Sequence, residues 1–84
     1  MLYKVELSKK AEKNLDRIDK RFKIRILKTL IRLETHPFLG KTLEGEYEGK
    51  RSCRVWPYRI IYEVRRNQLL VLVINIWHRQ GVYR

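Results

Sequence analysis

The run LLVLVINIW, residues 69–77, constrains the fold of this 84-residue chain more than any other segment. It is apolar at every position except Asn75, so a strand formed here would be hydrophobic on both faces. Such a strand is stable only where other elements cover both of its sides at least in part. We therefore expect this segment to lie centrally in a β-sheet.

Other segments have the two-residue period that is typical of strands. Residues 51–56 and 58–65 lie on either side of Pro57, and residues 66–68 predict a hairpin turn into the apolar run. The segment 58–65 carries Tyr58, Ile60, Tyr62 and Val64 on one face and Arg59, Ile61, Glu63 and Arg65 on the other. Residues 2–7 alternate in the same way and predict a short N-terminal strand.

Residues 9–36 have helical periodicity instead. Apolar residues recur every three or four positions up to the His36-Pro37 boundary, and Ser8 has the side chain of a helix N-cap. The pattern breaks near Asp19 to Arg21, which predicts two helices or one kinked helix. Residues 37–50 contain three of the four glycines and predict an irregular connection.

The order β-α-α-β-β-β predicts an α+β fold in which two N-terminal helices pack on one face of a small, mostly antiparallel sheet. A hydrophobic content of 44% suffices for one core, so residues 1–84 are expected to form a single domain. In that arrangement Tyr58 and Ile60 point into the helices, and Arg59 emerges from the uncovered face.

The chain is strongly basic. Its 20 Lys and Arg face 9 Asp and Glu, a formal net charge of +11, which favours a polyanionic partner, nucleic acid first and an acidic protein second. A solvated basic surface is the plainer alternative. The absence of an apolar signal core or membrane-length run predicts a cytoplasmic protein with no membrane contact. One cysteine and two dispersed histidines predict no disulfide within the chain, no metal and no cofactor.

Three motifs carry a resemblance to a known family: KTLEG at residues 41–45, RVWPYRIIYEV at 54–64 and HRQGVYR at 78–84. In order, spacing and total length the chain resembles the RelE/ParE superfamily of toxins from type II toxin–antitoxin modules, and YRIIYEV resembles the RelE-like branch. The resemblance implies the RelE-like fold, a ribosome-dependent endoribonuclease that cleaves mRNA during translation, and a cognate antitoxin that neutralises it.

The resemblance also implies the site. Arg59 and Arg79 correspond to the two catalytic arginines, Arg54 to a basic residue in the preceding strand and Tyr83 to the C-terminal tyrosine, all on the open face of the sheet. Lys50, Arg51 and Arg84 are assigned to RNA binding. Two positions depart from the family: Ser52 stands where many relatives have a second basic residue, and Trp56-Pro57 where relatives commonly have Gly-Asp or Gly-Asn.

Metal-independent cleavage of RNA requires the ribose 2′-hydroxyl to attack the neighbouring phosphate, and guanidinium groups suit the charge that develops there. Arginine is a poor general base, so Arg54 is expected to lower the 2′-hydroxyl pKa electrostatically. His78 has the pKa suited to proton transfer, although alternation places it on the face opposite Arg79. Tyr83 is expected to stack on a base or orient a phosphate, or else to pack against the sheet edge.

Three alternatives stay open at this point. One is that the chain is a ParE-like inhibitor of DNA gyrase without nuclease activity. Another is that it is a catalytically inactive RNA-binding relative, because Ser52 stands where many relatives have a basic residue. For Arg59 itself, the alternative to a catalytic role is an exposed sheet arginine paired with Glu63, which would contribute little stability.

Overall fold

A computed structural model of the chain describes residues 2–79. Four strands and two helices follow one another in the order that the sequence predicts, with one additional short strand, β2, and two 3-10 turns. They are β1 (Lys4–Leu7), α1 (Lys9–Asp16), α2 (Lys20–Arg32), β2 (Lys41–Thr42), η1 (Gly45–Tyr47), β3 (Arg51–Val55), β4 (Tyr58–Arg65), η2 (Arg66–Gln68) and β5 (Leu70–His78). The predicted irregular connection therefore contains a two-residue strand, β2, that the pattern missed.

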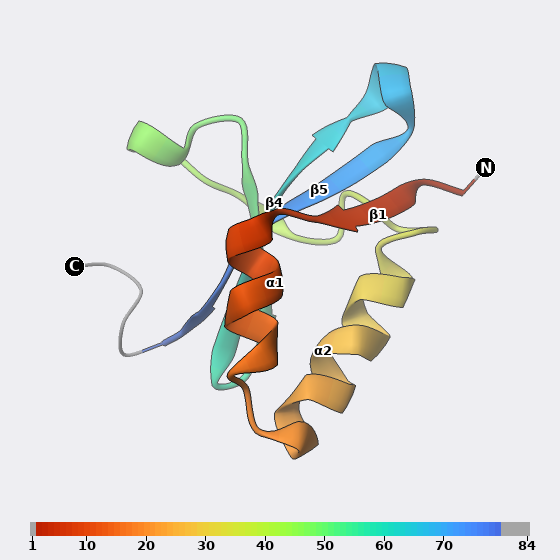
Figure 1. Ribbon diagram of the computed structural model, residues 1–84. Helices are drawn as coiled ribbons and strands as arrows, with labels where there is room; N and C mark the ends of the chain where they lie inside the picture. Colours follow the sequence, from red (N-terminus) through yellow and green to blue (C-terminus); the bar gives the residue numbers. More distant parts are fainter. Residues whose placement is uncertain (1, 80–84) are drawn as a thin grey trace.

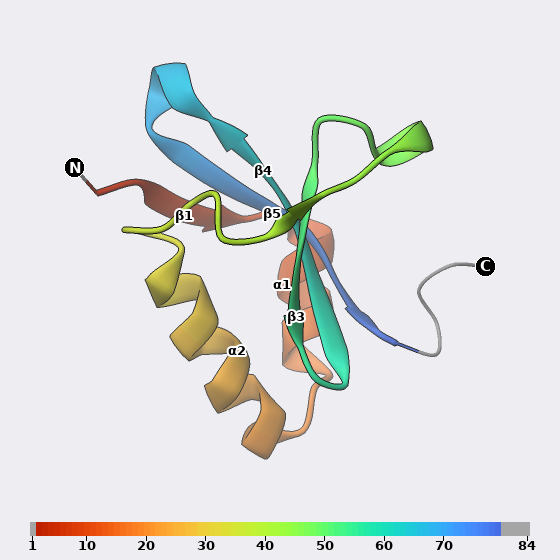
Figure 2. The same cartoon turned by 180° about the vertical axis from the view of Figure 1, so that it is seen from behind.

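The strands form one mixed sheet in the order β1-β5-β4-β3-β2. β1 runs parallel to β5, and every other neighbouring pair is antiparallel. The apolar strand β5 lies between β1 and β4, which confirms its expected interior place in the sheet. Both helices lie on one side of the sheet (Figure 1), and the view from behind has β3 and β4 in front of α1 (Figure 2). The predicted α+β architecture is confirmed.

The helix-covered face of the sheet holds the core. Ile60 and Tyr62 of β4 have no exposed surface, and the ring of Tyr58 packs on Phe22 of α2 at 5.8 Å between ring centres. The buried Tyr62 hydroxyl donates to the Pro37 carbonyl at 2.9 Å and accepts from the Gly40 amide at 2.8 Å. These two hydrogen bonds fix the segment that leads from α2 into β2.

Glycine is required at position 40. A Cβ there would lie 2.8 Å from both the Ser52 carbonyl oxygen and the Tyr62 hydroxyl, closer than van der Waals contact permits. The close approach keeps residues 37–40 against β3 and β4, so the strand that follows starts at a defined position.

Both helices begin at side-chain caps. The Ser8 hydroxyl accepts from the Ala11 amide at 3.0 Å, as predicted, and Asp19 accepts from the Arg21 amide at 2.9 Å at the expected break. The hydrogen bond from the Arg21 amide holds the pKa of the exposed Asp19 carboxyl below its usual value. No helix within residues 2–79 is long and apolar enough to cross a membrane.

A β-bulge interrupts the pairing of β4 with β5. Ile61 pairs with Asn75 and Tyr62 with Val73, which leaves Ile74 as an extra residue in β5. Two side chains of α1 and its N-cap stabilise the bulge. Ser8 Oγ donates to the Ile74 carbonyl at 2.8 Å, and Asn14 Oδ1 accepts from the Ile76 amide at 3.1 Å. The bulge shifts the alternation of β5, so Trp77 lies beside Arg59 on the face away from the helices.

Candidate functional site

Two arginines face each other across neighbouring strands on the face of the sheet that the helices leave open. Arg54 of β3 and Arg59 of β4 are direct partners in the antiparallel ladder, so their side chains leave the sheet on the same side. Arg54 is exposed and Arg59 half-buried. Arg59 was expected to emerge from the uncovered face, and the strand register places it there, directly beside Arg54.

A groove of about 380 Å³ lies over this pair. Its lining residues come from β2, β3 and β4 and the residue after β2: they are Lys41, Leu43, Ser52, Arg54 and Arg59. Within residues 2–79, the lining holds three cations and no carboxylate. Sequence reasoning singled out Arg54 and Arg59 but missed Lys41 and Leu43, although both belong to the KTLEG motif that carried the resemblance.

The positive charges of the groove repel one another and lower the stability of the fold. Like charges directly opposite each other on a sheet destabilise it by roughly 0.2–1 kcal/mol, unless an anion lies between them. The ion pairs among residues 2–79 join Lys4 to Glu6, Arg21 to Asp19 and Arg65 to Glu63, and none of them involves Arg54 or Lys41. Glu63 accepts a hydrogen bond from Arg65 at 3.1 Å. The groove is therefore suited to an external anion.

Arg79 lies just beyond β5, beside the turn between β3 and β4. Its amide donates to the Pro57 carbonyl at 2.8 Å, and its guanidinium carbon lies 4.6 Å from the ring centre of Trp56. The cis-linked Trp56-Pro57 turn, where the sequence departs from the family, thus supplies a backbone and an aromatic contact to Arg79.

Three other predicted residues lie away from the groove. His78 pairs with Tyr58 on the helix-covered face, with its ring edge-on to the Tyr58 ring at 5.2 Å. Arg51 also lies on that face, where its Nη1 donates to the Gly40 carbonyl at 2.8 Å and its guanidinium lies 4.9 Å from the Phe38 ring. Lys50 is half-buried before β3, and its carbonyl accepts from the Leu43 amide at 2.9 Å.

Arg51 therefore has a local structural role, because its side chain binds the segment that precedes β2 rather than the open face. Tyr83 and Arg84, expected to stack on a base and to bind RNA, lie outside the described residues.

The face beside the arginines carries an aromatic side chain. Trp77 is the ladder partner of Arg59, is half-buried and packs edge-on against Tyr47 of η1 at 5.7 Å. This contact brings the connection that contains η1 over part of the open face. Two residues earlier in β5, Asn75 is 5% exposed, and its Oδ1 has no hydrogen-bond partner within residues 2–79.

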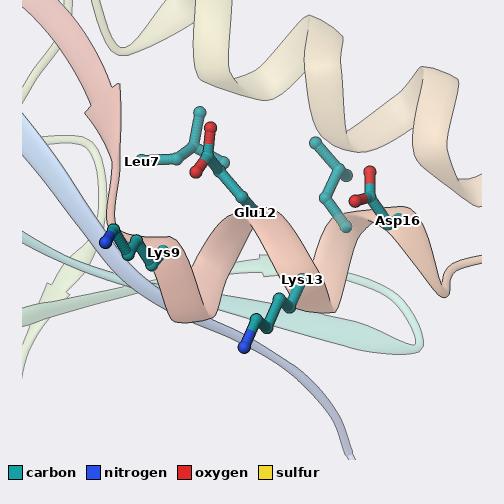
Figure 3. A pocket seen from close by; sticks show the side chains of 6 residues that line it. Leu7, Lys9, Glu12, Lys13 and Asp16 are labelled. Carbon is teal, nitrogen blue, oxygen red and sulfur yellow. The ribbon is translucent and has the colours of Figure 1, made fainter.

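A larger hollow lies elsewhere, along α1. It has a volume of about 530 Å³ and is lined by Leu7, Lys9, Glu12, Lys13, Leu15 and Asp16. In Figure 3 the two carboxylates point away from the two lysines. Its charges balance, so it lacks the excess positive charge of the groove. Among residues 2–79, no three His, Cys, Asp or Glu side chains gather as a metal ion would require.

Similarity to known proteins agrees with this geometry. The family of ParE toxins of type II toxin–antitoxin systems, parDE, matches residues 5–83. No curated protein sequence matches the chain. The toxin–antitoxin complex RelBE2 of Mycobacterium tuberculosis contains a chain with TM-score 0.88 and 25% identity, and the match covers 94% of this chain and 100% of that one.

Two further solved structures are similar. The archaeal RelE–RelB complex of Pyrococcus horikoshii has a chain with TM-score 0.82 and 26% identity, over 94% of this chain and 97% of that one. A mutant of the Escherichia coli toxin RelE in the free state has TM-score 0.81 and 17% identity, over 98% of this chain and 88% of that one. At this identity the similarity is one of fold. The match of the family over nearly the full length decides the assignment: the chain belongs to the ParE toxin family of type II toxin–antitoxin systems, within the RelE/ParE superfamily.

Proposed function

We propose that this toxin is a ribosome-dependent endoribonuclease that cleaves messenger RNA during translation. The observation that carries the proposal is the direct opposition of Arg54 and Arg59 in a groove whose described lining residues include a third cation and no carboxylate. A phosphodiester is the anion that such a groove fits, because guanidinium groups form paired hydrogen bonds with phosphate oxygens.

The proposed chemistry needs no metal. The 2′-oxygen forms a bond to the neighbouring phosphorus, the bond from phosphorus to the 5′-oxygen breaks, and the products carry a 2′,3′-cyclic phosphate and a 5′-hydroxyl. Arg59 and Arg54 stabilise the extra negative charge on the phosphate oxygens in the transition state. Arg79, supported by Trp56, acts on the same strand of RNA from the end of β5.

Proton transfer is not assigned to an arginine, because a guanidinium stays protonated at any working pH. His78 packs against Tyr58 on the other face, so we assign it a structural role. The 2′-hydroxyl proton then passes to, and the leaving 5′-oxygen receives its proton from, a group outside the described residues or on the ribosome. This requirement explains why the proposed cleavage depends on the ribosome.

We further propose that a cognate antitoxin neutralises the toxin by covering its basic open face. The similar chains from M. tuberculosis and P. horikoshii are themselves toxin components of complexes with antitoxins. The net charge of +11 favours an acidic covering segment.

The experiment adds purified toxin to a translating extract and maps the new RNA ends, with Arg59→Ala and Arg65→Ala in parallel. Arg65 is a matched control because it lies on the same strand and face as Arg59 but forms a surface ion pair with Glu63. The parent and Arg65→Ala should cut messages within ribosome-occupied codons, and Arg59→Ala should not. Intact messages at concentrations of the parent that stop translation would contradict the proposal.

The family match favours one second candidate, a ParE-like inhibitor of DNA gyrase without nuclease activity. A supercoiling assay with purified gyrase separates the two. The nuclease proposal predicts unchanged supercoiling at toxin concentrations that cut messages, and inhibition of gyrase without any message cleavage would establish the second candidate instead.

A further inference from the structure

Lys41 reaches the groove from a strand that the sequence pattern did not reveal. It is the ladder partner of Ser52 in the antiparallel pairing of β2 with β3. Direct partners in such a ladder lie on the same face with Cβ atoms about 5 Å apart, so the long lysine side chain extends over the small serine. Ser52 lies two residues from Arg54 on that face, and all three residues line the groove with Arg59.

The backbone at Lys41 is held on both sides. Before it, the Gly40 amide donates to the buried Tyr62 hydroxyl at 2.8 Å, where no larger residue fits. After it, the Leu43 amide donates to the Lys50 carbonyl at 2.9 Å. A two-residue strand has little stability of its own, so these anchors fix where the ammonium group of Lys41 can reach.

The ammonium group of Lys41 has no hydrogen-bond or ion-pair partner among residues 2–79. Its nearest charged neighbours in the groove lining are two arginines, and like charges so placed repel one another. A bound phosphate removes this repulsion. Lysine also suits a position beside paired arginines, because its point charge tolerates variation in where the phosphate oxygen lies.

We propose that Lys41 is a third phosphate-binding cation of the groove, which acts with Arg54 and Arg59 on the backbone of single-stranded RNA. This inference rests on the proposed function, and it adds a substrate-binding residue to it. Ser52 leaves the space through which the lysine side chain reaches the phosphate.

The first test measures binding of a single-stranded 2′-deoxy oligonucleotide, which has no 2′-hydroxyl and so is not cleaved, over a range of salt concentrations. Lys41→Ala should weaken binding at low salt and reduce the slope of log K against log salt by about 0.7, the value for one phosphate contact with a single strand. Lys4→Ala is the control, because Lys4 lies on the same face in the edge strand β1 at the opposite end of the sheet. Equal slopes for the parent and Lys41→Ala would overturn the inference.

The second test moves the lysine charge from position 41 of β2 to its ladder partner, position 52 of β3. In the double variant Lys41→Ala/Ser52→Lys, the ammonium group originates from β3 on the same face, so the lost slope and affinity should return in large part. Lys41→Arg should retain them as well. A purely structural role for Lys41 in β2 would not be rescued by a lysine at position 52, and failure of both rescues would overturn the inference. Thermal unfolding of every variant reports whether the fold is kept.

The third test keeps this inference distinct from the proposed function. If the toxin cleaves messages on ribosomes, Lys41→Ala should reduce the rate about tenfold to a hundredfold, the range for losing one charge-assisted hydrogen bond. An unchanged rate would contradict the role of Lys41. A parent that cuts nothing would overturn the proposed function, while the salt dependence of oligonucleotide binding would still decide whether Lys41 binds phosphate.

Discussion

The two faces of β4 differ sharply although they are built from alternate residues of one strand. On the helix-covered face Ile60 and Tyr62 are fully buried and hold the helices and the segment before β2 in place. On the open face Arg59 stands opposite Arg54, a placement that lowers stability. The difference shows that alternate residues of one eight-residue strand have different roles: Ile60 and Tyr62 belong to the core under the helices, whereas Arg59, on the face that also carries the buried Ile61, is available for the proposed chemistry.

Arg59→Ala should have the largest effect on function and only a small effect on stability. Loss of one preorganised donor in an oxyanion-type site costs about 10²–10³ in rate, whereas a substitution at a partly exposed position changes the free energy of unfolding by about 0.5 kcal/mol or less. Message cleavage and urea unfolding, measured on the same preparation, check both halves. If the variant cleaves as fast as the parent, the open face of β4 does not carry the proposed chemistry.

Tyr62→Phe should do the reverse. Loss of the hydroxyl leaves the Gly40 amide and the Pro37 carbonyl without their partner in a buried place, at a cost of about 1–3 kcal/mol of unfolding free energy. Urea unfolding measures this cost. A stability equal to that of the parent would mean that water or a neighbouring group replaces the hydroxyl.

The same residue predicts a pH effect. Burial raises the pKa of the Tyr62 hydroxyl above its ordinary value of 10.0, so the folded protein holds this proton more tightly than the unfolded chain. The resulting stabilisation is complete below pH 10 and is lost as the pH rises through the higher pKa of the folded state. In Tyr62→Phe this contribution is absent, so the stability difference between parent and variant should shrink above pH 10. A constant difference would contradict the assignment.

Arg54→Thr should raise stability slightly while it weakens RNA binding. Removal of one of two opposed like charges, with a residue that favours strands in its place, should add roughly 0.2–1 kcal/mol to the free energy of unfolding. Thermal unfolding at low salt measures the gain. A lower stability would mean that Arg54 contributes packing on the open face that outweighs the repulsion.

The smallest expected effect compares two adjacent positions of β3 by thiol reactivity. Burial raises the pKa of the Cys53 thiol, partly offset by the charge of Arg32, so this thiol should react slowly with a disulfide reagent at pH 8 in the folded protein. In the double variant Cys53→Ala/Arg54→Cys the thiol faces solvent and should react much faster. Equal rates would mean that the two faces differ less in access than the structure indicates.

Much of the fold followed from local patterns. The cap at Ser8, the break near Asp19, the two helical segments and the three C-terminal strands depend on neighbours close in sequence, so period and capping chemistry sufficed to predict them. The place of β1 beside β5 was not predicted, because parallel pairing joins segments more than sixty residues apart. The bulge at Ile74 could not be predicted either, since the contacts that stabilise it come from α1 and its N-cap.

The candidate site divides in the same way. Arg54 and Arg59 could be placed on one face by counting residues along two strands that share a short turn. Lys41 could not, because its strand has only two residues and lies in a glycine-rich connection. Nor could the contacts of Arg79 with Trp56 and Pro57 be predicted, since they depend on where the bulged strand β5 ends.

One measurement tests the central claim most directly: titration of the isotope-labelled toxin with a single-stranded 2′-deoxy oligonucleotide, followed by NMR signals of the arginine guanidinium and lysine ammonium groups. The account predicts that the signals of Arg54, Arg59 and Lys41 shift together with one binding curve, while those of Arg21 and Lys4 stay in place. Shifts confined to the helices, with the three groove residues unaffected, would contradict it.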